Sequence, residues 1–171
     1  MIENAIQIIC VYAIPLIFAI TLHEAAHGWA AKKLGDDTAW ILGRVTANPV
    51  PHIDPVGTVL VPGALVLMSA LTGGAGFVFG WAKPVPVTTR NFKNVKKGMI
   101  LTALAGPAAN ILLALLSLIL YKLWCYFLYP LLAINFTTAS AIAQIFYIMC
   151  LLNINLAVFN LIPIPPLDGS R

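Results

Sequence analysis

The chain has 171 residues, enough for one domain; 60% of them are hydrophobic and only 9% are charged. An average soluble protein has about 25% charged residues, and a soluble fold of this size could not hide so much apolar surface. The formal net charge is +4, and five of the ten basic residues fall within residues 83–97. These values exclude an ordinary soluble domain and a nucleic-acid-binding surface, and they predict a membrane protein with a basic loop beside anionic lipid.

The first long apolar run covers residues 5–31. At about 1.5 Å per residue, a helix of this length can cross a bilayer core of about 30 Å. Lys32 and Lys33 end the run, and Gly35 is suited to a helix C-cap. The polar, turn-rich residues 36–56 then predict a loop.

The next part of the chain is less regular. Residues 57–79 are apolar but contain prolines and glycines, which predicts either a crossing helix or a re-entrant one. Residues 77–90 read as extended chain, because Pro84 and Pro86 are excluded from a helix interior. We therefore expect a short β-strand or re-entrant region between the first and the later helices.

Two further runs, residues 99–121 and 138–162, predict membrane-spanning helices. Prolines follow the second run and break the helix shortly before Asp168. The predicted fold is thus an all-α, multi-pass membrane protein, with residues 1–171 forming a single domain.

The sequence His23-Glu24-Ala25-Ala26-His27 lies inside the first apolar run. Positions i and i+4 share one helix face, so the two imidazoles can bind one metal ion, and Glu24 can act as general base toward a water molecule. Ionisable side chains within a membrane helix are costly unless they are paired or bound to something. A packed polar cluster or a proton relay is the alternative interpretation of this motif.

A catalytic zinc ion needs a third protein ligand and one open coordination position. Asp168 is favoured as that ligand because it follows a broken helix, and irregular backbone at membrane depth occurs where it lines a cavity or is buried in protein. The alternative role of Asp168 is to cap a following helix. The other candidate ligands are the cysteines and Glu3, Asp36, Asp37, His52 and Asp54.

Three ordered motifs and one segment carry a family resemblance: His23-Glu24-x-x-His27, Gly106-Pro107-Ala-Ala-Asn110, Asn160-x-x-Pro163 leading to Leu167-Asp168-Gly169, and residues 79–87. With these features the chain resembles the site-2 protease family of intramembrane metalloproteases, peptidase family M50, in its compact form without a PDZ domain. The resemblance extends from residue 23 to residue 169.

The resemblance implies Zn²⁺ bound by His23, His27 and Asp168, with Glu24 as the base. It also implies that the chain cleaves the transmembrane helix of a protein or peptide substrate in the lipid bilayer. The family usually continues as a further helix, so we expect a chain that ends at Arg171 to be C-terminally truncated.

Two asparagines are candidates for roles beside the metal. Asn160 belongs to the family motif, and its carboxamide could stabilise the oxyanion of the tetrahedral intermediate. Asn110 lies on a face of small residues with Thr102 and Gly106, where it either orients the substrate or a ligand, or forms a hydrogen bond between helices. His52 is expected to be a structural histidine near the membrane interface.

The spacing of Pro84 and Pro86 has a consequence for the extended segment. Backbone N–H groups alternate between the two edges of a strand, so these prolines remove donors from one edge, whereas Val85 and Val87 keep theirs on the other. We expect this second edge to bind a substrate segment by strand addition.

The basic residues 83–97 predict a cytoplasmic loop, which places Asp168 and the histidines near the cytoplasmic face. Compactness and short loops favour a prokaryotic plasma membrane. The predicted function is intramembrane endopeptidase activity on membrane-anchored regulators or leftover signal peptides. The alternative is a zinc-binding membrane transporter or sensor without hydrolysis, and Glu24 favours the hydrolase because a zinc carrier needs no base there.

Overall fold

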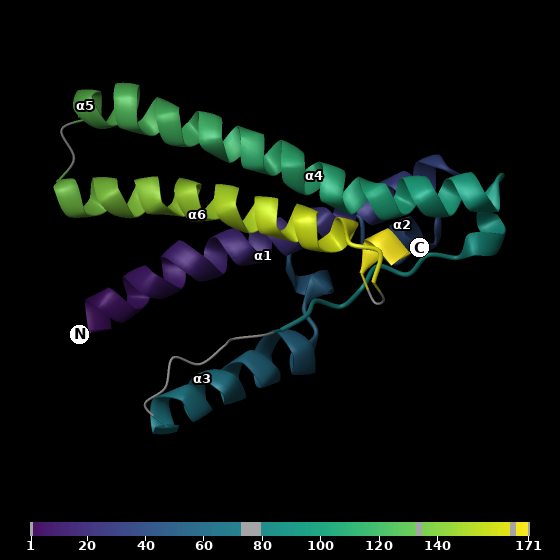
Figure 1. Cartoon of the computed structure of the whole chain (residues 1–171), viewed down its shortest axis with the longest axis horizontal. Coiled ribbons are helices and arrows are strands. Elements are labelled where there is room, and N and C mark those ends of the chain that lie inside the picture. The colour runs from purple at the N-terminus through teal and green to yellow at the C-terminus, as the bar shows by residue number, and fades with distance from the viewer. Residues whose placement is uncertain (1, 73–79, 133–134, 165–166, 171) are drawn as a thin grey trace.

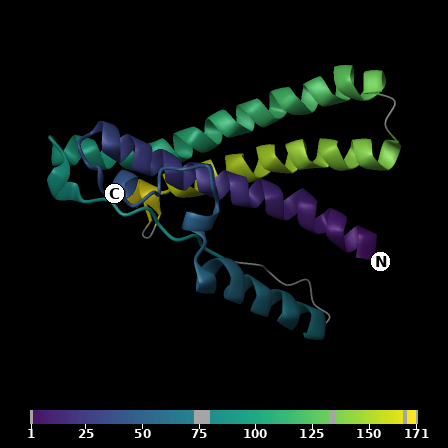
Figure 2. The ribbon, with the colours of Figure 1, turned by 180° about the vertical axis from the view of Figure 1, so that it is seen from behind.

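A computed structural model describes residues 2–72, 80–132, 135–164 and 167–170 of the chain. Three long helices lie side by side over much of their length: α1 (Ile2–Lys33), α4 (Val95–Leu123) and α6 (Phe136–Leu161) (Figure 1). The course of the chain makes α4 antiparallel to both α1 and α6, and the view from behind shows the same bundle (Figure 2). The predicted helical architecture is confirmed.

The end of α1 and the start of α4 lie at the same end of the bundle. Gly35 has a φ of +112°, which confirms it as the residue that turns the chain out of α1. α4 starts after Asn94, whose side chain accepts a hydrogen bond from the Lys97 amide. A Cβ atom at Gly35 would lie 2.9 Å from the Asn91 carbonyl oxygen, so the chain just after α1 packs closely against the chain just before α4.

α4 continues through a π-helical turn, Trp124–Leu128, into the short α5 (Tyr129–Leu132). The chain then reverses into α6, and the Trp124 indole Nε1 donates a 3.0 Å hydrogen bond to the Ala139 carbonyl oxygen. Trp124 is buried, so this bond fastens α4 to α6 at the end of the bundle far from α2 (Thr38–Ile41) (Figure 1).

Two helical stretches, Val95–Leu132 and Phe136–Leu161, are long and apolar enough to cross a membrane by their length and composition. Many of their large apolar side chains point outward, including Leu112, Ile119 and Phe159. Lipid is a suitable environment for such a surface, whereas water is not. The structure thus agrees with a membrane location for the chain.

The structure of residues 55–88 differs in part from the sequence prediction. A π-helical turn, Pro55–Leu60, leads into α3 (Val61–Thr72), which diverges from the bundle in both views (Figures 1 and 2). Residues 80–88, which we name the extended segment, contain no helix and no strand, and residues 77–79 lie outside the described part. The predicted short β-strand is therefore not confirmed, because no second strand runs beside the described residues of this segment.

Candidate metal centre

Three side chains from distant parts of the sequence meet at one point within the bundle. The Oδ2 atom of Asp168 lies 3.0 Å from Nε2 of His23 and 3.0 Å from Nε2 of His27. The two Nε2 atoms are also 3.0 Å apart. Both histidines are buried, so these atoms form a nearly equilateral triangle largely shielded from solvent.

The histidines come from successive turns of α1, as the i and i+4 spacing predicts. Asp168 reaches them because the chain folds back after α6, which ends at Leu161. Gly169 makes this close return possible, since a Cβ atom there would lie 2.6 Å from the Leu161 carbonyl oxygen. Asp168 begins a single 3-10 turn, Asp168–Ser170, and its carboxylate faces the histidines.

α4 covers the centre with backbone rather than with a bulky side chain. The Thr102 carbonyl oxygen accepts a 2.7 Å hydrogen bond from the Nδ1–H group of His27. The ring therefore carries its proton on Nδ1, and the lone pair on Nε2 is directed at the centre. A Cβ atom at Gly106 would lie 2.4 Å from Nε2 of His27 and 2.6 Å from Cε1 of His23. Only glycine leaves room for the imidazoles at this position.

The donor set fits a zinc ion. His27 presents a lone pair at Nε2, and Asp168 presents a carboxylate oxygen 3.0 Å away, so these acceptors need a shared proton or cation between them. Zinc binds histidine nitrogen and carboxylate oxygen at about 2.0–2.2 Å, and a triangle of donors about 3 Å apart has points at that distance from all three. Two histidines and one carboxylate form the three-ligand set of a catalytic zinc site with an open position. His23, His27 and Asp168 are the one such group that the described residues form.

Glu24 is fixed next to this centre by the extended segment. Its Oε2 atom accepts a 2.9 Å hydrogen bond from the backbone N–H of Val85, and its Oε1 atom makes no hydrogen bond to any described residue. The sequence predicted that the N–H groups of Val85 and Val87 would both be open to a partner strand. The Val85 donor is instead bound to Glu24, whereas the Val87 donor has no hydrogen-bond partner in the described part.

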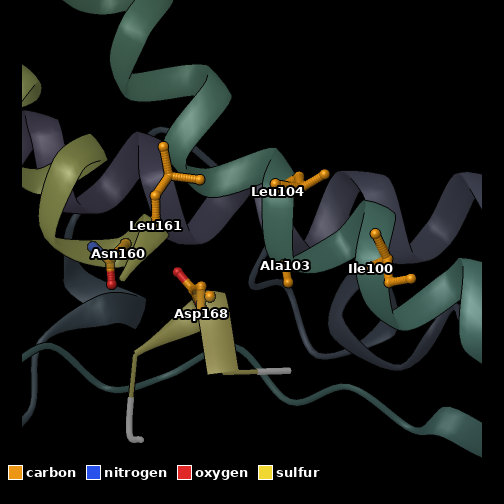
Figure 3. Close-up of a pocket in the computed structure, with 7 residues that line it drawn as sticks. Ile100, Ala103, Leu104, Asn160, Leu161 and Asp168 are labelled. Carbon is orange, nitrogen blue, oxygen red and sulfur yellow. The ribbon is translucent and has the colours of Figure 1, made fainter. Parts of the chain in front are cut away.

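Asn160 lies beside Asp168 at a small cavity of about 140 Å³. Figure 3 shows both side chains on one side of this space, with Ala103, Leu104 and Ile100 of α4 on the other. The Nδ2 atom of Asn160 donates to the Leu156 carbonyl oxygen at 3.0 Å, which uses one of its two N–H groups. The second N–H group has no partner among the described residues.

Asn110 is fully buried, and neither its Nδ2 nor its Oδ1 atom has a hydrogen-bond partner in the described residues. It lies one helical turn after Gly106, the residue in contact with the histidines. Buried amides without partners are rare, because the lost hydrogen bonds cost about 1–3 kcal/mol. Asn110 thus has two free polar atoms in the interior of the bundle, close to the metal centre along α4.

The other candidate ligands have different roles. His52 is buried in the loop, with Nε2 at 3.3 Å from the Thr46 carbonyl oxygen. Asp54 caps the turn at Pro55–Leu60, and Asp36 binds neutral donors in the loop after α1. Asp37 is exposed, Cys125 and Cys150 are free thiols outside the metal-binding group, and the side chain of Glu3 lies outside the described part.

Comparisons with known proteins find relatives by sequence. The sequence model of peptidase family M50 matches residues 130–171, the part that contains Asn160 and Asp168. A candidate zinc metalloprotease of Bacillus subtilis, YwhC, is 42% identical over 92% of this chain and 65% of its own length. A candidate zinc metalloprotease of Mycolicibacterium smegmatis, Rip2, is 35% identical over 90% of this chain and 52% of its own length. No solved structure gives a significant match.

A buried His-Glu-x-x-His helix that meets a distant aspartate among apolar helices is typical of membrane metalloproteins with a catalytic type of zinc site. Within that class, the chain is similar to peptidase family M50 and to the Bacillus zinc metalloprotease. It spans 65% of the Bacillus relative and about half of the mycobacterial ones, at 52%.

Two contributors to the site were missed in the sequence. Gly106 was assigned to a helix-packing face, although its place in the Gly106-Pro107 motif was a signal of a special position. The Thr102 carbonyl oxygen carries no sequence signal, because every residue has a backbone carbonyl group.

Proposed function

We propose that the chain is an intramembrane zinc endopeptidase, which hydrolyses peptide bonds within or next to the transmembrane segments of membrane-anchored substrates. The observation that carries this proposal is the convergence of His23, His27 and Asp168 beside Glu24. The names of the relatives, which describe zinc metalloproteases, support both the metal and the class of reaction.

When bound, the zinc ion supplies a Lewis acid that polarises a carbonyl group and lowers the pKa of water. The chain's own residues do the remaining work. Glu24 accepts the proton of the attacking water at Oε1, the carboxylate oxygen without a hydrogen bond, and passes it to the leaving amine. Thr102 holds the His27 ring in place through its carbonyl oxygen.

Asn160 and Asn110 have supporting roles in the proposed reaction. The unused N–H group of Asn160 donates to the negative charge that develops on the substrate's carbonyl oxygen, since Asn160 shares a cavity with Asp168. Asn110 offers unpartnered polar atoms in the same bundle and orients the substrate or a ligand near the metal centre. In this role Asn110 gains the hydrogen bonds that it lacks among the described residues.

A helical substrate must unwind before cleavage, because its peptide bonds are internally hydrogen-bonded. The extended segment can receive the unwound substrate by strand addition at the Val87 N–H group, which lies two residues from the Glu24 contact. This assigns the two donors different tasks: Val85 binds Glu24 and Val87 binds substrate.

The distribution of charge supports a site near the cytoplasmic face. Lys32 and Lys33 end α1, and further lysines lie at the start of α4, at the same end of the bundle. The positive-inside rule assigns this end to the cytoplasm of a multi-pass protein in a prokaryotic plasma membrane. His27 precedes Lys33 by six residues, which corresponds to about 9 Å along the helix. In this arrangement α3 enters the membrane as a re-entrant helix.

The decisive experiment compares zinc content and peptidase activity in purified wild type, Glu24→Gln and Asp168→Ala. We expect Glu24→Gln to retain zinc and lose activity, because the amide cannot accept the proton at neutral pH. Asp168→Ala should bind zinc at least about tenfold more weakly, because one of three ligands is lost. The exposed Asp37→Asn is the control for loss of a carboxylate, with both properties retained.

Two results would contradict the proposal. A Glu24→Gln protein that cleaves at the wild-type rate removes the assigned base. A wild-type protein that holds one zinc ion but cleaves no transmembrane substrate supports the other class, a zinc-binding transporter or sensor.

A further inference from the structure

Two buried charged side chains of the loop after α1 bind the extended segment, at two separate points. The first point is Asp36, whose side chain is fully buried. Its Oδ2 atom accepts a 2.7 Å hydrogen bond from the Thr88 backbone N–H, while Oδ1 accepts from the Thr38 hydroxyl and, at 2.8 Å, from Nδ2 of Asn91. Burial opposes ionisation of Asp36, but the hydrogen bonds from Thr38, Thr88 and Asn91 outweigh it and lower the carboxyl pKa.

The second point is Arg44, whose side chain is also buried. Its Nη2 atom donates to the Lys83 carbonyl oxygen at 2.6 Å and to the Pro84 carbonyl oxygen at 3.2 Å. A buried guanidinium group is costly unless it finds acceptors, and both acceptors that Arg44 has among the described residues belong to the extended segment. Arg44 therefore has little freedom to release this part of the chain.

The contact with Glu24 lies between these two points. Arg44 holds residues 83 and 84, Asp36 holds residue 88, and the Val85 N–H group between them donates to Glu24. Pro84 and Pro86 have no N–H groups, so the segment cannot be fastened through backbone donors at those positions. Asp36 and Arg44 supply hydrogen bonds that hold this segment, whose prolines cannot donate the backbone hydrogen bonds of a sheet.

We propose that Asp36 and Arg44 are positioning residues, which hold the extended segment so that the Val85 amide fixes the Glu24 carboxylate beside the metal centre. The catalytic consequence rests on the proposed function, because it requires Glu24 to be the base. Fixing Oε2 leaves Oε1, which makes no hydrogen bond to any described residue, available for proton transfer. Misplacing a reacting group by about 1 Å can reduce a rate by up to about 100-fold. Neither residue touches the metal ligands in the described structure.

The first test measures the anchoring itself by hydrogen exchange in detergent-solubilised protein. A peptide covering residues 83–88 has only four backbone N–H groups, and those of Lys83, Val85 and Thr88 are hydrogen-bonded. We expect Asp36→Asn and Arg44→Gln to speed exchange in this peptide at least about tenfold, with zinc content and exchange in α1 unchanged. Asp37→Asn and Arg90→Gln, both at exposed positions, are the matched controls.

The second test measures catalysis in the same proteins with a transmembrane peptide substrate. We expect kcat to fall about tenfold in Asp36→Asn and Arg44→Gln, with KM changed less than about threefold. Arg44→Lys, which keeps the charge and can still reach one carbonyl oxygen, should recover part of kcat. A purely structural role would lower the zinc content and the amount of folded protein instead.

The outcomes separate this inference from the proposed function. Unchanged exchange in the 83–88 peptide overturns the anchoring, whatever the activity. Faster exchange with unchanged kcat, with a higher kcat, or with a raised KM alone overturns the positioning role; a higher kcat would identify the Val85 contact as an inhibitory latch. An inactive wild type rejects the proposed function, while the exchange data still decide whether Asp36 and Arg44 anchor the segment.

Discussion

The bundle of α1, α4 and α6 and the extended segment serve the same site by different means. The bundle supplies side chains: two histidines from α1 and an aspartate that follows α6, packed against a glycine of α4. The extended segment supplies a backbone N–H group to Glu24 and is itself held by side chains from a loop. Helix packing thus sets the positions of the proposed metal ligands, whereas the orientation of Glu24, the proposed base, depends on a backbone N–H group of the extended segment.

The bundle and the extended segment should therefore respond differently to mutation. The bundle has no room for added volume at the metal centre, because a Cβ atom at Gly106 would overlap the imidazoles of His23 and His27. The extended segment can lose a side chain and still present the same N–H group, but it cannot lose the N–H group.

Gly106→Ala should have the largest effect on the metal centre. The added methyl group would lie 2.4 Å from Nε2 of His27, so the helices or the imidazoles must move. We expect zinc affinity to fall at least about 100-fold and activity to be lost, measured by zinc titration and peptide cleavage. Gly63→Ala in α3 is the matched control, because no described residue lies within 4 Å of its added methyl group. Wild-type zinc affinity in Gly106→Ala would show that the bundle is less rigid than described.

Two proline substitutions separate the tasks of the extended segment. Val85→Pro removes the donor to Glu24 and should reduce kcat by about 10–100-fold with zinc retained. Val87→Pro removes the donor assigned to substrate and should mainly raise KM. Val85→Ala, which keeps the N–H group, distinguishes loss of the donor from loss of the buried side chain. Equal kinetic effects of the two proline variants would contradict this division of tasks.

Trp124→Phe should weaken the far end of the bundle without changing the site. The substitution removes the hydrogen bond to the Ala139 carbonyl oxygen, which we expect to cost about 1 kcal/mol of unfolding free energy. Thermal unfolding in detergent should therefore shift downward by a few degrees, with zinc content and cleavage rate unchanged. The exposed Trp29→Phe is the control. A loss of zinc in Trp124→Phe would show that the two ends of the bundle are coupled.

The sequence was a good guide where a motif and a periodic pattern coincided. The His-Glu-x-x-His spacing predicted two ligands on one face of α1, and the apolar runs predicted α4 and α6 to within a few residues. The proposed third ligand, Asp168, lies in the structure where that interpretation requires it. The prediction was wrong about the availability of the Val85 N–H group, because the alternation of donors along a strand does not reveal which neighbour lies at the edge.

Local sequence patterns were therefore enough to predict the class of environment, the proposed metal ligands and the helices α1 and α6 that bring them together. Composition and i, i+4 spacing act locally, and they act in the same way wherever the helix lies. Only the tertiary structure decided that Glu24 is bound by Val85, and that Asp36 and Arg44 anchor the segment that provides this donor. These contacts join residues 39 to 61 positions apart through backbone groups, and backbone groups are the same in every residue.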